Sequence, residues 1–213
     1  MRMSKMFAKT LREAPNGADC KGYEYLLRAG FIRQLGSGIF TMLPLGMRST
    51  KKIEAIIREE MDRIGGQEIL MSVVNPADIW KETGRWYSID KEMGRFQDRN
   101  GRDMVLAMTN EETVTDCARG EIDSYKRLPV MVYQIQTKWG DDPRPRAGLI
   151  RVREFTMKDA YSFHATQESL DEAYADQYKA YFRIYSRCGL PCVAVGADSG
   201  MMGGKVSHEY MYL

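Results

Sequence analysis

The stretch VMVYQIQTKWGDDPRPRAGLIRVREF, residues 130–155, determines the fold class. Residues 130–139 are rich in β-forming side chains, and residues 149–155 are predicted to form a second strand. The loop between them, 141–148, contains two prolines that the interior of a helix would not tolerate. A short loop joins neighbouring strands in an antiparallel sheet, and helical segments flank this pair, so the sequence predicts an α+β fold.

Hydrophobic periodicity and turn residues place the other elements. Gly65-Gly66 is a typical helix terminator, and Asn100-Gly101 is a strong signal for a two-residue hairpin turn. The patterns predict helices over 47–64, 111–125 and 170–188, strands over 68–74 and 191–195, and a hairpin within 96–106.

Composition restricts the class of protein. The 213 residues include 44% apolar and 28% charged side chains, which is ordinary for a soluble globular chain. No apolar run approaches the roughly 18 residues of a membrane helix, and the first residues lack the apolar core of a secretory signal. We therefore expect a cytoplasmic protein. The formal net charge of +2 is too balanced to indicate nucleic-acid binding by itself.

The usual metal, phosphate and nucleophile motifs are not found. Cysteines 20, 117, 188 and 192 and histidines 164 and 208 form no recognisable ligand spacing, so no metal site is predicted. No serine stands in a nucleophile elbow. The run 200–204 contains glycines but lacks the Gly-Lys-Ser/Thr ending of a P-loop.

Two arginines and an aromatic ring alternate in the second predicted strand. In a strand, Arg151, Arg153 and Phe155 would share one face. Guanidinium groups beside a ring suit a polyphosphate carrying a flat base, and Arg144 and Arg146 add charge from the preceding loop. The alternative is a solvated strand face with scattered salt bridges, which the spacing alone favours.

A second candidate, Thr109-Asn110-Glu111-Glu112, follows a strand and precedes a helix. The hydroxyl of Thr109 and a carboxylate there would suit a ligand's ammonium group. The alternative is that Thr109 is the N-cap and that the acidic residues complement the helix dipole. The local pattern alone favours capping.

Taken in order, these segments resemble the catalytic domain of class II aminoacyl-tRNA synthetases, specifically the bacterial-type prolyl-tRNA synthetases. The resemblance runs along nearly the whole chain and depends on an ordered set of motifs. These are LRAGFI (27–32), LPLG (43–46), TNEE (109–112), YQIQTK (133–138), RPR (144–146), RVREFTMKDAYSFH (151–164) and SHEY (207–210).

The resemblance implies an antiparallel sheet flanked by helices in a homodimer that binds ATP with Mg²⁺. The implied reaction joins proline to AMP and then transfers proline to tRNA(Pro). Arg151 would contact the γ-phosphate, and Phe155 would stack on adenine. The implied roles of the remaining residues are adenine recognition for Asp142, binding of the proline ammonium for Thr109 and Glu111, and contact with the tRNA acceptor end for Arg144 and Arg146.

The sequence departs from the family pattern at four positions. Gly140 replaces an arginine that contacts the α-phosphate and the substrate carboxylate, and Asp142 is one methylene shorter than the usual glutamate. Ser72 stands where the first motif ends in proline, which affects the expected dimer interface, and Asn110 replaces a common histidine.

We therefore expect residues 1–213 to be a partial class II catalytic core. The sequence holds no counterpart of the family's third motif, editing insertion or anticodon-binding domain. Loss of an electrostatic contact to the transition state typically costs several kcal/mol, so weak or absent activity is expected of this chain alone. The alternative is a non-catalytic paralogue that binds a nucleotide, a tRNA end or a protein partner.

Overall fold

A pair of ten-residue antiparallel strands, β7 (Val130–Trp139) and β8 (Glu154–Phe163), forms the centre of the fold. Their register runs without interruption from Val130 opposite Phe163 to Trp139 opposite Glu154. The two-residue strand β3 (Gln67–Glu68) pairs in parallel with the other edge of β7. The predicted antiparallel pair, and with it the α+β class, is confirmed.

The structure, a computed structural model, describes residues 2–13, 15–200 and 203–213; Met201 and Met202 of the glycine-rich run lie outside it. The helices are α1 (Lys21–Arg28), α2 (Pro44–Arg63), α3 (Ala77–Glu82), α4 (Arg85–Ser88), α5 (Glu111–Glu121) and α6 (Gln167–Arg187). The other strands are β1 (Ile32–Gly36), β2 (Ile39–Met42), β4 (Val74–Pro76), β5 (Gly94–Gln97), β6 (Asp103–Leu106), β9 (Cys192–Gly196) and β10 (His208–Tyr212). Two 3₁₀ turns cover Met3–Lys5 and Tyr125–Arg127.

The second predicted strand is wrong at its start. Residues 149–153 are not in β8, and Arg151 makes only an isolated antiparallel bridge to Arg146. The backbone N–H of Arg153 donates instead to the carbonyl of Gly38, 2.9 Å away, in the turn between β1 and β2. Arg153 still accepts from the Gly140 backbone N–H at 2.9 Å, but the ladder with β7 ends at Glu154, so Arg151 and Phe155 do not share a strand face.

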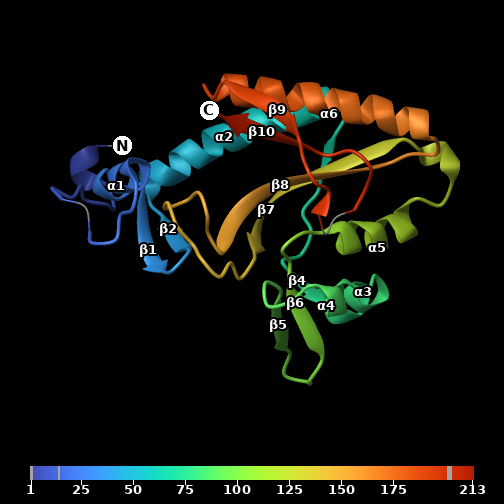
Figure 1. Ribbon diagram of the computed structural model, residues 1–213, viewed down its shortest axis with the longest axis horizontal. Helices are drawn as coiled ribbons and strands as arrows, with labels where there is room; N and C mark the ends of the chain where they lie inside the picture. Colours follow the sequence, from blue (N-terminus) through green and yellow to red (C-terminus); the bar gives the residue numbers. More distant parts are fainter. Residues whose placement is uncertain (1, 14, 201–202) are drawn as a thin grey trace.

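Helices α2 and α6 lie side by side over one face of β7 and β8 (Figure 1). Met61 of α2 and Met131 and Tyr133 of β7 are buried between these layers. Helix α2 begins at Pro44, three residues earlier than predicted, because proline fits the first helical turn. It ends as predicted beside Gly65, whose φ of +84° favours glycine.

Two smaller units flank this centre. The first consists of α1 and the β1–β2 hairpin around Tyr23, Leu27 and Ile32. The second is a three-stranded sheet, ordered β4-β6-β5, whose core side chains include Trp80 and Val105. The predicted hairpin within 96–106 is confirmed as β5 and β6.

Other predicted boundaries change. The strand predicted over 68–74 is divided into β3 and β4, and the helix predicted over 111–125 ends at Glu121. Helix α6 and strand β9 lie within one to three residues of their predicted limits. Strand β10 was not predicted; it pairs antiparallel with β9, from His208 opposite Gly196 to Tyr212 opposite Cys192.

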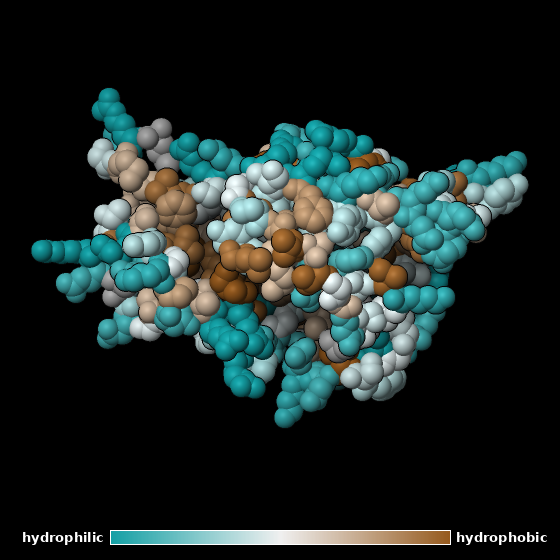
Figure 2. All heavy atoms as spheres, turned by 45° about the horizontal axis from the view of Figure 1, so that its top comes forward, coloured by the Kyte–Doolittle hydropathy of each residue, from teal (hydrophilic) through white to brown (hydrophobic). Residues whose placement is uncertain are grey.

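The outer side of the β9–β10 pair is apolar. Val193, Val195 and Met211 are each at least two-fifths exposed. Figure 2 shows hydrophobic side chains gathered in the middle of the face formed by the upper side of Figure 1. Within the described ranges, no helix is both long and apolar enough to cross a membrane.

A buried carboxylate joins the two long helices. The Glu60 side chain on α2 is 1% exposed, and it accepts hydrogen bonds from Arg183 Nε at 2.6 Å and Arg187 Nη1 at 2.8 Å on α6. Burial alone would raise the pKa of Glu60, but the bonds from Arg183 and Arg187 lower it below its usual range. Neighbouring Glu59 contacts Arg187 from an exposed position.

Glu60→Ala should lower the free energy of unfolding by about 2–3 kcal/mol at neutral pH, because it removes buried charge-assisted hydrogen bonds. The matched variant Glu59→Ala should change it by less than about 1 kcal/mol, as exposed ion pairs do. Because the folded-state pKa is lowered, the contribution of Glu60 is lost as the pH falls below about 4. Urea unfolding at pH 7 and pH 3.5 measures both effects; equal losses for the two variants would contradict this role.

Candidate functional site

One face of the β7–β8 pair carries polar side chains that are nearly inaccessible to solvent. Gln134 and Lys138 of β7 are fully buried, and Asp159 of β8, directly opposite Gln134, is 9% exposed. Tyr161 follows two residues later and therefore lies on the same face. This face meets the start of α5, where Asn110 is also fully buried. We call these five residues the polar cluster.

Asp159 is the centre of the polar cluster. Its Oδ2 atom accepts hydrogen bonds from Gln134 Nε2 at 2.9 Å and from the Tyr161 hydroxyl at 2.6 Å. Its Oδ1 atom lies 3.1 Å from Lys138 Nζ. Burial lowers the pKa of Lys138, and the nearby Asp159 and Glu111 carboxylates oppose that shift. Burial, followed by the bond to Asp159, raises the pKa of Tyr161.

The polar cluster holds the segment before α5. Gln134 Nε2 donates to Asn110 Oδ1 at 3.0 Å, and the backbone N–H of Asn110 donates to the Tyr161 hydroxyl at 3.0 Å. The Asn110 amide nitrogen also approaches the Ser72 carbonyl oxygen at 3.5 Å. The two unusual residues Asn110 and Ser72 are thus linked, and Asn110, which lies between Thr109 and Glu111, is fixed to the sheet.

Thr109 and Glu111 are brought together as predicted. The Thr109 hydroxyl donates to a carboxylate oxygen of Glu111, which is half-buried. Asn110, rather than Thr109, occupies the N-cap position, and its side chain makes no capping hydrogen bond. The capping interpretation of Thr109 is therefore wrong. Arg85 Nη1 lies 3.3 Å from Glu111 and 3.1 Å from the buried carboxylate of Glu112.

The arginines lie on the loop 141–153 that connects β7 to β8. Arg151 Nε donates to Asp142 Oδ2 at 2.6 Å, so this predicted pair is brought together. The bond from Arg151, with one from the Arg144 backbone, lowers the pKa of Asp142. The side chains of Arg144 and Arg146 are exposed. They are available to a large ligand at the surface.

Phe155 lies apart from Arg151. It is half-buried opposite Lys138 on β8 and lines a cavity of about 290 Å³ with Met42, Leu149 and Val152. Arg151 instead lines a smaller space of about 80 Å³ beside Tyr23. Phe155 does face the same side of the sheet as the polar cluster.

The two ends of the candidate site are adjacent. The backbone N–H of Trp139 donates to the carbonyl of Ala107 at 3.0 Å. This bond places the segment leading to Thr109 beside the start of the loop 141–153, which we call the arginine loop. The segment that leads to Glu111 and the strand that leads to the loop of Arg151 are therefore neighbours at these two residues.

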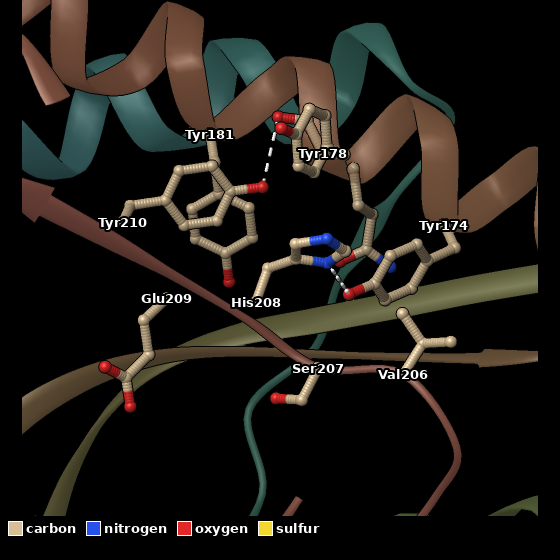
Figure 3. Close-up of a pocket in the computed structure, with 9 residues that line it drawn as sticks. Tyr174, Tyr178, Tyr181, Val206, Ser207, His208, Glu209 and Tyr210 are labelled. Atoms are coloured by element: carbon tan, nitrogen blue, oxygen red, sulfur yellow. Dashed lines mark hydrogen bonds between the residues drawn. The ribbon is translucent and has the colours of Figure 1, made fainter. Parts of the chain in front are cut away.

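A cavity of about 370 Å³ between α6 and β10 contains none of the predicted site residues. Its rings already contact one another, because Tyr181 stacks on Tyr210 and Tyr174 hydrogen-bonds His208 at 2.7 Å (Figure 3). These contacts dock β10 on α6.

Sequence reasoning missed the roles of Gln134, Lys138 and Asp159. The signal was present, since polar residues recur at alternate positions in strands that are otherwise apolar. Such a pattern indicates either a solvated face or a buried network, and only the packing of α5 distinguishes them.

Comparison with known families identifies the fold. The family model described as tRNA synthetase class II core domain (G, H, P, S and T) matches residues 94–212, more than half of the chain. The chain therefore belongs to the class II tRNA synthetase core family. It is 58% identical over its whole length to the proline–tRNA ligase of Salinispora tropica and 57% identical to that of Geobacillus thermodenitrificans. The predicted resemblance to prolyl-tRNA synthetases is confirmed.

The chain covers 36% and 38% of the lengths of those two relatives. Solved structures support the fold. The Giardia lamblia prolyl-tRNA synthetase in complex with prolyl-adenylate aligns with a TM-score of 0.72 and 22% identity, over 78% of this chain and 35% of that one. The Cryptosporidium parvum prolyl-tRNA synthetase complexed with halofuginone and AMPPNP aligns with a TM-score of 0.78 and 15% identity, over 88% and 39%.

Tyr161→Phe should lower the free energy of unfolding by about 1–3 kcal/mol, because it leaves the Asn110 amide without its acceptor. It should also speed hydrogen exchange at the Asn110 amide. Tyr125→Phe, in which an exposed hydroxyl is removed, should change stability by no more than about 0.5 kcal/mol. Urea unfolding and amide exchange measure the difference; unchanged exchange at Asn110 would contradict the assigned contact.

Proposed function

We propose that this chain is part of the catalytic core of a proline–tRNA ligase and binds proline and Mg·ATP. The observation that carries the proposal is the bond from Trp139 to Ala107, which supports it by joining the segment before Glu111 to the strand before the loop of Asp142 and Arg151. The two solved neighbours, described with prolyl-adenylate and AMPPNP, support it.

In the proposed site, Thr109 and Glu111 bind the proline ammonium group. The carboxylate of Glu111 already accepts from Thr109 and pairs with Arg85, so it is oriented before proline arrives. Burial of its flanking residues excludes water from one side of this contact. A charge-assisted hydrogen bond in such surroundings is about twice as strong as a neutral one.

Arg151 is the proposed phosphate ligand and acts in catalysis by binding charge. It contacts Asp142, which is proposed to read the adenine amino group. Phe155 is proposed as the stacking surface for adenine, although in this structure it lines a separate cavity from Arg151. For the phosphates to reach Arg151 while adenine stacks on Phe155, the nucleotide would have to span the two cavities, or the loop would have to move.

In the proposed reaction, a carboxylate oxygen of proline forms a bond to the α-phosphorus of ATP. The bond from that phosphorus to the bridging oxygen breaks, and pyrophosphate leaves. The ribose hydroxyl at the end of tRNA(Pro) then attacks the prolyl carbonyl and AMP leaves. Catalysis of this kind depends on positioning and on stabilising charge. The exposed Arg144 and Arg146 are proposed to contact the tRNA end.

Magnesium is proposed to be bound chiefly by the ATP phosphates. In the part of the chain that the structure describes, no three Asp, Glu, His or Cys side chains gather as a metal site. Mg²⁺ commonly uses only one or two carboxylates together with substrate phosphates. A homodimer, with Ser72 near the family's usual interface, and a cytoplasmic location remain proposals as well.

The alternative function is a non-catalytic paralogue that binds a nucleotide, a tRNA end or a protein partner. Gly140 favours it, because the arginine expected there is absent. Apart from its two chain neighbours, no described atom lies within 4 Å of the place where a Cβ on Gly140 would stand. The first atom of a side chain would therefore meet open space at this position.

Calorimetric titration of proline and of Mg·ATP into this chain tests the proposal. Glu111→Gln should weaken proline binding at least about tenfold and leave ATP binding unchanged, whereas Arg151→Ala should do the reverse. Absence of binding of either ligand by the unsubstituted chain would overturn the proposal. Binding of ATP without proline would favour the paralogue.

This chain should show negligible proline-dependent exchange of pyrophosphate into ATP, because it carries Gly140 and no counterpart of the third motif. Loss of charge stabilisation typically reduces turnover by about 10²–10³ for each donor. Radiolabelled pyrophosphate exchange measures this directly. Turnover approaching that of a complete proline–tRNA ligase would show that exchange needs neither an arginine at position 140 nor the third motif.

Gly140→Arg should tighten Mg·ATP binding about tenfold, or about 1.4 kcal/mol, by restoring a guanidinium beside Asp142. A Cβ on Gly140 meets no described atom within 4 Å apart from its chain neighbours, so the new side chain starts in open space. Gly120→Arg adds the same charge at another open glycine, on α5, and should leave the affinity unchanged. If both variants bind alike, net charge alone is responsible; unchanged affinity in Gly140→Arg would favour the paralogue.

A further inference from the structure

The arginine loop is held from outside the central sheet. The β1–β2 hairpin lies beside the loop that joins β7 to β8 (Figure 1). In addition to the bond from the Arg153 backbone to Gly38, Arg153 Nη1 donates to the Ser37 carbonyl at 3.3 Å. Earlier in the loop, the backbone N–H of Ala147 donates to Asp19 Oδ2 at 2.8 Å. Two segments that precede α2 thus bind the loop at separate points.

The approach at Gly38 is too close for any other residue. Its φ is +72°, and a Cβ there would lie 2.9 Å from the Cβ and Cγ atoms of Pro145 and 3.0 Å from the Arg153 nitrogen. In the loop itself, Gly148 lies equally close to helix α1, since a Cβ on Gly148 would lie 2.8 Å from the Tyr23 ring. The backbone of the hairpin turn therefore packs against the Pro145 ring and the Arg153 nitrogen, and the loop backbone at Gly148 packs against the Tyr23 side chain.

Arg153 connects this packing to the Asp142–Arg151 pair. Its Nε donates to the Asp142 carbonyl oxygen at 3.0 Å and lies 2.9 Å from Asp141 Oδ1. The guanidinium of Arg153 is thus engaged on several sides by the loop and the hairpin. It is a loop-fixing group and not a second phosphate ligand beside Arg151.

We propose that Asp19, Gly38 and Arg153 are positioning residues that hold the arginine loop in its nucleotide-binding conformation. The inference deepens the proposed function, because it assumes that Arg151 and Asp142 bind ATP. We call Asp19, Gly38 and Arg153 the clamp. A loop ordered before binding loses less conformational entropy when the ligand arrives, so the clamp raises the affinity for ATP without touching ATP. Proline, bound by the segment before α5, is outside its influence.

Gly38→Ala and Gly101→Ala form a matched pair for the test. Both glycines lie in hairpin turns with nearly equal φ, +72° and +75°, so the backbone strain is similar. A Cβ on Gly101 meets no described atom within 4 Å, whereas one on Gly38 meets the loop. Asp19→Ala supplies a second, exposed substitution that removes the acceptor for Ala147 and leaves the core intact.

The first measurement is limited trypsin digestion without ligand. Within the loop 141–153, trypsin can cut after Arg146, Arg151 and Arg153 but not between Arg144 and Pro145, so the cut after Arg146 is identified by the masses of its fragments. Gly38→Ala and Asp19→Ala should speed this cut by about fivefold or more, because cleavage follows the population of the opened loop. Gly101→Ala should leave it unchanged. Unchanged cleavage in both clamp variants would overturn the inference whether or not ATP binds.

The second measurement compares the Kd for Mg·ATP with the Kd for proline in each variant. Gly38→Ala and Asp19→Ala should raise the Kd for Mg·ATP about tenfold and leave the Kd for proline within about twofold, since only the arginine loop is released. An equal rise in both constants would mean a general structural defect and would also overturn the inference. If the unsubstituted chain binds no ATP, the proposed function fails, while the digestion result still decides whether the clamp exists.

Discussion

A single buried carboxylate, Asp159, determines how the central sheet and the start of α5 fit together. It accepts two hydrogen bonds and faces a fully buried ammonium group, so its charge is compensated within the protein. A carboxylate at this depth is stable only when such partners are present. The partners come from both strands, and two of them, Gln134 and Tyr161, also bond Asn110. The position of Thr109 and Glu111 follows from this arrangement.

The arginine loop is built on a different principle. It contributes few side chains to a hydrophobic core, and it is held by hydrogen bonds to the Gly38 carbonyl and the Asp19 carboxylate and by the close approach of Pro145 to Gly38. Contacts of this kind are directional and local, so the loop can be released without unfolding the sheet. The proposed site therefore combines a part held by the polar cluster at α5 with a part held by contacts to the hairpin of β1 and β2.

The sequence predicted the parts of the fold that depend on periodicity. Strand β7, helices α2 and α6 and the β5–β6 hairpin carry strong patterns and are confirmed. The start of β8 was wrong because residues 149–153 have strand-like composition, yet a carbonyl more than a hundred residues away binds Arg153. The N-cap at Thr109 was wrong for the same reason, since the Asn110 backbone bonds to Tyr161. Long-range hydrogen bonds of this kind leave no local pattern.

The contact between Asp142 and Arg151 has a consequence for selectivity among anions. Because the carboxylate is tethered nine residues from the guanidinium, it competes for that group at an effective concentration in the millimolar range or above. Small monovalent anions at lower concentration cannot displace it. A polyanion that gains further contacts elsewhere can exchange places with it. Asp142 is thus an internal counter-ion for the Nε atom of Arg151.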